Sequence, residues 1–310
     1  MSAPAKLQAT VPIEAAMRGR RGATVVVKYG GAAMGDEAAA DLWARDVVRL
    51  ARTGLRPVVV HGGGPALTRM LSRLGIESTF VDGLRVTSAE AAEVAEMVLS
   101  GRINKDLVSR LHRAGGRAIG LSGTDGALLR VRPMRPGGRD IGFVADVESV
   151  DTEPLILLLE RGYTPVLSST AADENGRPYN INADHVAGAV AAALRVEMLI
   201  FLTDVGGLSL EGATVSSIGG GRVRHLLDDG SITGGMRPKL EAALTAVDAG
   251  VPNVHLVDGR EPHALVDVFM TGGAAGTRIT AEGARTPIVP AAGADHRAGP
   301  RSAAREEGRT

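Results

Sequence analysis

Short β-branched runs alternate with longer helical segments through the first part of this chain. TVVV at residues 24–27 precedes a helical pattern that ends at Gly54, and PVVV at 57–60 precedes a second one that ends at Gly75. Apolar strands separated by helices are typical of a parallel sheet that is buried on both faces and connected by right-handed crossovers. The sequence therefore predicts an α/β fold, with an open, mainly parallel central sheet and helices on both faces.

Residues 128–150 interrupt this alternation. Two strand-like segments, LLRVRP and IGFVADVESV, flank the turn-forming PGGRD. This arrangement predicts an inserted β-hairpin that could cover a site.

Helix boundaries are also marked in the sequence. Thr87 and Glu90 have the spacing of a capping box, which predicts the start of a helix that is interrupted at Gly101. Either Asn182 or Asp184 could cap the apolar helix that begins near residue 184.

The 310 residues, 44% of them apolar, are enough for about two domains. We place the folded core at residues 23–280, with lobes at 23–192 and 193–280. Residues 1–22 are predicted to be a disordered extension or, alternatively, a helix that docks on another subunit. Gly, Ala, Pro and charged residues dominate 281–310, which predicts a disordered tail.

Composition argues against several classes of function. The 35 basic and 35 acidic residues balance, so no overall field attracts nucleic acid or an anionic membrane. The absence of cysteine excludes disulfides and thiolate metal sites and favours a cytoplasmic protein. The amino-terminal segment lacks the apolar core of a signal peptide, and no apolar run approaches the roughly 18 residues of a membrane span.

Two glycine clusters follow predicted strands. Lys28, Gly30 and Gly31 end the first strand, and Gly62–Gly64 end the second, just before Pro65. Ligands bind beyond the carboxyl ends of parallel strands, and glycine loops followed by helix N-termini can present backbone N–H groups to anions. Either cluster alone could be a structural turn, but the pair predicts a phosphate site.

Other nucleotide-binding patterns are missing. The chain has no GxxxxGK[ST] loop, no HRD or DFG segment and no GxGxxG fingerprint. His61 is interpreted as a hydrogen-bonding residue at a strand end, and no metal-ligand cluster is predicted. Phosphoryl transfer depends mainly on positioning, Mg²⁺ and positive charge, which two lysines and glycine amides could supply.

Six ordered segments, KYGGAAM, HGGGP, GLRVT, YNINAD, LTDVGGL and GGMRPKLEAA, resemble the amino acid kinase family, and within it the acetylglutamate kinases, over roughly residues 23–280. The resemblance implies ATP-dependent phosphorylation of the γ-carboxylate of N-acetyl-L-glutamate, with Mg²⁺, in arginine biosynthesis. It also implies that the first lobe binds acetylglutamate and the second binds ATP. A homodimer is expected, with a hexamer as the alternative, and inhibition by arginine stays open.

The resemblance also assigns roles to residues. Lys28 and Lys239 would stabilise the transferring phosphoryl group, and Asp184 would position both. The remaining assignments are Gly30, Gly31 and Gly62 for the phosphoryl group, Gly63, Gly64, Arg85 and Asn180 for the substrate, and Thr203, Asp204, Gly207, Leu208 and Gly235 for the nucleotide.

Physical chemistry agrees with these assignments but leaves simpler interpretations open. The planar fork of Arg85 suits a carboxylate, although an exposed loop arginine would look the same. Lys239 follows Pro238 at the start of a helix, where a cation opposes the helix dipole unless an anion shares the site. Asn180 could equally belong to a turn.

Three residues depart from the family pattern, namely Ala32, Ala145 and Arg237. None has an assigned chemical role, so they bear on rate and affinity more than on the reaction. Two rival hypotheses are a kinase for another acylated amino acid, such as carrier-linked aminoadipate, and a non-catalytic regulatory domain on the same fold.

Overall fold

The computed structural model describes residues 17, 19–34, 36–81, 83–271 and 276–281. Its centre is an eight-stranded sheet, which is parallel except for the pair β15–β16. Across the sheet the strands follow in the order β14 (Ser217–Gly219), β16 (Thr277–Thr280), β15 (Val254–Asp258), β11 (Met198–Thr203), β1 (Thr24–Tyr29), β2 (Arg56–His61), β8 (Thr164–Ser168) and β5 (Ala118–Leu121). The predicted α/β fold with an open, mainly parallel sheet is confirmed.

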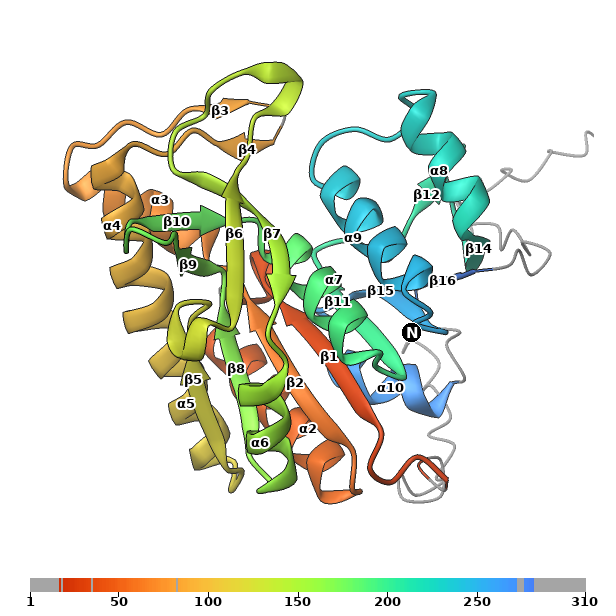
Figure 1. Ribbon diagram of the computed structural model, residues 1–310. Coiled ribbons are helices and arrows are strands. Elements are labelled where there is room, and N and C mark those ends of the chain that lie inside the picture. Colours follow the sequence, from red (N-terminus) through yellow and green to blue (C-terminus); the bar gives the residue numbers. More distant parts are fainter. Residues whose placement is uncertain (1–16, 18, 35, 82, 272–275, 282–310) are drawn as a thin grey trace, which may run out of the picture.

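Helices cover both faces of this sheet, as Figure 1 shows. Alternate residues of β1 point to opposite sides, so that Val26 joins one apolar cluster while Val25 and Val27 join another. The first cluster includes α6 (Glu153–Glu160), α7 (Ala183–Leu194), α8 (Gly220–Asp228) and α9 (Met236–Asp248), and the second includes α2 (Glu37–Arg52), α5 (Asn104–Arg113) and α10 (Ala264–Met270). Burial on both faces explains the uninterrupted β-branched runs of the sequence.

A smaller sheet stands over the carboxyl ends of the first strands (Figure 1). The predicted hairpin is confirmed as the antiparallel pair β6 (Leu129–Pro133) and β7 (Val144–Val150). Two further strands, β10 (Pro178–Ile181) and β9 (Thr170–Ala172), extend it into a four-stranded sheet. Short pairs, β3 (Phe80–Val81) with β4 (Leu84–Arg85) and β12 (Ser209–Leu210) with β13 (Ala213–Thr214), complete the strands.

The helix predicted to break at Gly101 continues through it. A π-helical segment, Met97–Ile103, joins α4 (Ala89–Glu96) directly to α5. The π-helical segment, α4 and α3 (Gly64–Arg73) form an apolar cluster of their own. The predicted capping box is also wrong by one residue. Ser88 caps α4 by accepting from the Ala91 N–H at 3.1 Å, whereas the buried Thr87 hydroxyl donates to the Arg85 carbonyl.

One sheet runs through both predicted lobes, because β1 pairs with β11, so the lobe boundary between residues 192 and 193 stays a prediction. Most of the predicted extension at 1–22 and of the predicted tail at 281–310 lies outside the described residues, although Met17 is buried. In the described part of the chain, none of the helices combines the length and apolarity that crossing a membrane requires.

Candidate functional site

Asp184 binds two lysines at the carboxyl edge of the central sheet. Its Oδ1 lies 2.9 Å from Nζ of Lys28, on β1, and its Oδ2 lies 2.9 Å from Nζ of Lys239, on α9. The side chains of Lys28, Asp184 and Lys239 are 8%, 7% and 15% exposed. Two ammonium groups around one carboxylate leave an excess positive charge in a poorly hydrated place, which favours binding of an anion.

The charge state of Asp184 follows from its neighbours. Burial alone would raise the pKa of this carboxyl, but Lys28 and Lys239 outweigh burial and hold the pKa below its usual value of 3.8. The carboxylate is therefore ionised at neutral pH. Lys239 lies in the first turn of α9, where the helix dipole disfavours a cation, and Asp184 compensates for that placement.

Asn182 caps the helix that carries Asp184. Its Oδ1 accepts from the Asp184 N–H at 2.8 Å, which settles the choice between the two predicted caps. The cap fixes the first turn of α7, so Asp184 points toward the ends of β1 and α9 at once. Capping and charge placement are thus assigned to two different residues.

The two predicted glycine loops lie side by side. Strands β1 and β2 pair in register up to Tyr29 and His61, and the Gly62 N–H donates to the Tyr29 carbonyl at 3.2 Å. A Cβ at Gly30 would lie 2.8 Å from Nζ of Lys28, so a side chain there would push that ammonium aside, and Gly31 has a φ of +68°.

Gly63 and Gly64 form the entrance of α3. A Cβ at Gly63 would lie 2.2 Å from Cδ1 of Ile103, so a side chain there would force Ile103 to move, and Pro65 occupies the first turn of the helix. The first N–H groups of a helix have no partner within it. These glycines line the same cavity as Lys28, so helix-terminal N–H groups and the ammonium lie close together.

Arg85 lies in a cavity of about 270 Å³ that it shares with Lys28, the glycine loops and Asn180. Its Nη2 donates to Oγ1 of Thr68 at 2.7 Å, its Nη1 donates to Oγ of Ser78, and its guanidinium stands 4.7 Å from the ring centre of Phe80. Burial lowers the pKa of Arg85. Within the described ranges no acidic side chain pairs with this arginine, and it is 7% exposed, which excludes the exposed loop arginine considered from the sequence.

Asn180 belongs to the small sheet rather than to a turn. Its backbone N–H donates to the Phe143 carbonyl at 3.0 Å, and in register it faces Val144 of β7. Asn180 lines the same cavity as Arg85 and Lys28. The small sheet thus contributes one wall of this cavity.

The predicted nucleotide residues follow β11 and precede α9. The Thr203 hydroxyl donates to the Val205 carbonyl at 2.6 Å, and Asp204 is exposed. Gly207 has a φ of +130°, and the buried Leu208 donates its N–H to Oγ1 of Thr277 at 2.8 Å. Leu208 therefore anchors the loop. Gly235 caps α9 three residues before Pro238.

A buried polar group behind the glycine loops escaped prediction. Nδ2 of Asn104 lies 2.8 Å from the Val166 carbonyl and 3.1 Å from Nε2 of His61, and both side chains are fully buried. Burial lowers the pKa of His61 to about 4, so the ring is neutral. Asn104 is the first residue of α5, directly after the π-helical segment. No pattern in the sequence around it indicated its contact with His61.

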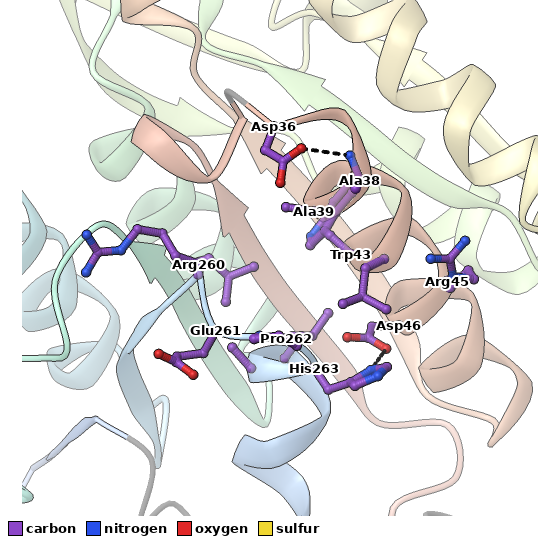
Figure 2. A pocket seen from close by; sticks show the side chains of 15 residues that line it. Asp36, Ala38, Ala39, Trp43, Arg45, Asp46, Arg260, Glu261, Pro262 and His263 are labelled. Carbon is purple, nitrogen blue, oxygen red and sulfur yellow. Dashed lines mark hydrogen bonds and ion pairs between the residues drawn. The ribbon is translucent and has the colours of Figure 1, made fainter. Parts of the chain in front are cut away.

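A second cavity lies on the opposite face of the sheet and contains none of the predicted site residues. It has a volume of about 360 Å³, and Figure 2 shows Asp36, Trp43, Asp46, Arg260 and His263 around it. Asp46 Oδ1 lies 2.9 Å from Nδ1 of His263, which ties α2 to the start of α10. This contact has a structural role.

Comparisons with known proteins agree with this geometry. An acetylglutamate kinase of Synechococcus sp. is 50% identical over 266 residues, which are 84% of this chain and 88% of that protein. One from Erythrobacter litoralis is 48% identical over 84% of this chain and 91% of its own length. The crystal structure of smu.665 from Streptococcus mutans UA159 has a TM-score of 0.72 at 30% identity and covers 84% of this chain and 99% of that one. Because the profile described as "Amino acid kinase family" also matches residues 23–258, the chain belongs to the amino acid kinase family.

Proposed function

We propose that this chain is an ATP-dependent kinase for the γ-carboxylate of N-acetyl-L-glutamate, which it converts to N-acetyl-L-glutamyl 5-phosphate in arginine biosynthesis. The observation that carries the proposal is the pair of lysines held on the buried Asp184, next to a cavity that the buried Arg85 also lines. Relatives described as acetylglutamate kinase support this choice of substrate.

The cavity suits a molecule with two carboxylates. Arg85 offers a guanidinium already oriented by Thr68 and Ser78, so it can hold an α-carboxylate in two parallel hydrogen bonds. The glycine loops border the same cavity, beside Lys28, and would receive the γ-carboxylate. Asn180 offers an amide that can bond to the acetylamino group.

The transfer itself needs no proton. An oxygen of the γ-carboxylate attacks the γ-phosphorus of ATP, the bond to the bridging oxygen breaks, and ADP leaves with the electron pair. Lys28, Lys239 and the N–H groups of the glycine loops stabilise the negative charge on the equatorial oxygens. Asp184 fixes both ammonium groups before the substrates arrive.

ATP is proposed to bind as its Mg²⁺ complex along the C-terminal half of the site. Thr203, Asp204, Gly207, Leu208 and Gly235 are the proposed nucleotide residues, and Lys239 begins the helix beside them. Mg²⁺ in such sites is held by one or two carboxylates and by the phosphates themselves. When bound, Mg²⁺ would supply positive charge that offsets the charge of the phosphates.

Arg85→Lys is expected to raise the KM for N-acetyl-L-glutamate by about tenfold or more and to leave the KM for ATP nearly unchanged, because an ammonium cannot replace the two-pronged contact. Steady-state kinetics measure both constants. Arg73→Lys, an exposed position on α3, is the matched control. An unchanged KM for N-acetyl-L-glutamate would remove Arg85 from the substrate site.

The substrate is tested by trapping the acyl phosphate with hydroxylamine. Protein supplied with ATP, Mg²⁺ and N-acetyl-L-glutamate is expected to yield the hydroxamate. Turnover of a carrier-linked aminoadipate instead would favour the rival kinase, and no turnover of any acylated amino acid would favour a regulatory domain.

Location and assembly are proposals as well. We expect a cytoplasmic enzyme, as the cysteine-free composition suggests, that forms a homodimer, with a hexamer as the alternative. Light scattering on the eluted protein distinguishes the two assemblies, and a monomer would contradict both.

A further inference from the structure

His185 lies between two carboxylates that come from different elements. It follows Asp184 in the first turn of α7. Its Nδ1 lies 3.3 Å from Oδ1 of Asp146, on β7, and its Nε2 lies 3.6 Å from Oε2 of Glu241, on α9. Glu241 also pairs with Arg237, at 2.8 Å from Nε to Oε1. Because His185 is only 15% exposed, these contacts are largely shielded from water.

Two ion pairs of opposite direction connect the helices α7 and α9. Asp184 is the anion toward Lys239, and the next residue, His185, is the cation toward Glu241. α7 thus presents an anion and a cation, each opposite a residue of the other sign on α9. Sliding or rotation of α9 would break both contacts. The geometry fixes α9 in one register against α7.

The two helices touch through their backbones at the next turn. A Cβ at Gly188 of α7 would lie 2.6 Å from the carbonyl oxygen of Ala242 on α9. No large side chain lies between the two helices at this crossing, so side chains cannot rearrange to absorb a shift of α9. A shift of the helix would therefore displace the side chains it carries. The position of Lys239 depends on this crossing.

His185 is a cation at neutral pH. Burial alone would lower the pKa of the ring, but Asp146 and Glu241 outweigh burial and raise it from 6.5 to about 9. The pKa values of Asp146 and Glu241 are lowered, chiefly by His185.

Most other charged groups on the elements that pack against α7 are paired, neutral or distant from His185. Lys28 from β1 and Lys239 from α9 bind Asp184, and His61 of β2 is neutral. Arg56 lies at the opposite end of β2, and β11 carries no titratable side chain. Besides Asp146 on β7 and Glu241 on α9, Arg237 acts on His185 through Glu241, and Arg132 of β6, opposite Asp146 in register, also lowers the pKa of that carboxyl. Glu148, the other carboxylate of β7, is exposed.

We propose that protonated His185 is a positioning residue for the phosphoryl transfer, because it holds Asp146 and Glu241 together and thereby fixes Lys239 relative to the sheet that carries Asn180. This inference rests on the proposed function, since it assigns Lys239 to the transferring group. Asp146 is two residues beyond Val144, which pairs in register with Asn180 and lines the cavity with it, so the contact holds the strand beside the substrate wall. Without the imidazolium, two carboxylates would face each other across α7 and repel.

His185→Gln is expected to lower kcat by about tenfold, because misplacement of a catalytic group by a fraction of an ångström is costly. The wild-type kcat should also fall as pH rises through about 9, since the folded state holds the imidazolium below that pH and loses it above. That alkaline limb should vanish in His185→Gln and move to higher pH in His185→Lys, which keeps a cation and most of the activity. His225→Gln, at an exposed His–Asp pair of α8, is the matched control.

An NMR titration of the His185 ring tests the contact without any substrate, so its result is independent of the proposed function. The ring is expected to titrate near pH 9, and Asp146→Asn should lower that pKa and shift the alkaline limb with it. Asp146→Asn also serves if His185→Gln does not fold. A ring that titrates at or below 6.5, or a folded His185→Gln with unchanged kcat and an unchanged alkaline limb, would overturn the proposal.

Discussion

Lys28→Ala is expected to lower kcat by about a thousandfold and to leave the KM for N-acetyl-L-glutamate within about threefold of wild type. The Nζ of Lys28 contacts Asp184 and lies beside the glycine loops. This is the place where negative charge is proposed to develop on the phosphoryl group during transfer. Its interaction should thus be strongest in the transition state, and only kcat should suffer. Steady-state kinetics in the hydroxamate assay measure both constants.

The distribution of cations in the chain sharpens this prediction. The sequence contains four lysines and 31 arginines, and two of those lysines meet at one carboxylate. A compact ammonium can share Asp184 with a second cation and leave room for a phosphoryl group, whereas the larger guanidinium cannot. Lys28→Arg should therefore also be impaired. Lys105→Ala, at an exposed lysine, is the control, and a large rise in KM with kcat intact would assign Lys28 to substrate binding instead.

Asp184→Asn is expected to reduce kcat at least as strongly as Lys28→Ala and, in addition, to destabilise the fold by about 3 kcal/mol. The substitution leaves two poorly exposed ammonium groups without their shared counter-ion. Urea unfolding of both proteins measures the difference in the free energy of unfolding. Asp248→Asn, in the exposed pair with Arg224, is the control and should change neither quantity appreciably.

The effect of Asp184 on stability has a defined pH dependence. Its pKa is lower in the folded state than the usual 3.8, so its contribution is present above that pH and is lost as pH falls through the folded value. The stability difference between wild type and Asp184→Asn should hence be constant near neutral pH and shrink in acid. A difference that grows in acid would mean that Asp184 is not held as an anion by the lysines.

The parts of the fold that depend on local pattern could be predicted. Runs of β-branched residues indicate buried strands such as β1 and β2, and the parallel pairing of these two strands brings the two glycine loops together. Pairings between distant strands could not be predicted in this way. Strands β9 and β10 extend the hairpin through contacts made after the chain has passed through α6 and β8.

The misplaced boundaries have physical reasons as well. Thr87 and Ser88 can both cap a helix, and tertiary structure decided between them by burying the Thr87 hydroxyl against the Arg85 carbonyl. Gly101 has a low helix propensity, yet packing of α3 against α4 and the π-helical segment keeps the helix continuous. Two of the three departures from the family pattern have described contacts: Ala145 is buried on β7 opposite Ile181, and Arg237 pairs with Glu241.

The site residues also fall into two groups, those that could be predicted and those that could not. Resemblance to the family gave Lys28, Asp184 and Lys239, whose distances of 2.9 Å are consistent with a clamp. It gave no indication of Thr68 and Ser78, which orient Arg85, because neither lies in the segments that carry the resemblance. It gave none of His185 either, whose partners lie on β7 and α9, far from it in sequence. Side chains whose role is to position other side chains belong to no recognisable sequence motif here.

The central claim is that Lys28 and Lys239, both held by Asp184, contact the transferring phosphoryl group as a two-lysine clamp. Its most direct test is a crystal structure with Mg²⁺, ADP, aluminium fluoride and N-acetyl-L-glutamate. Aluminium fluoride imitates the phosphoryl group during transfer, so Nζ of both Lys28 and Lys239 should lie within about 3 Å of its fluorine atoms. The γ-carboxylate should face it from the side of Arg85. An aluminium fluoride that either Nζ approaches no closer than about 5 Å would contradict the clamp.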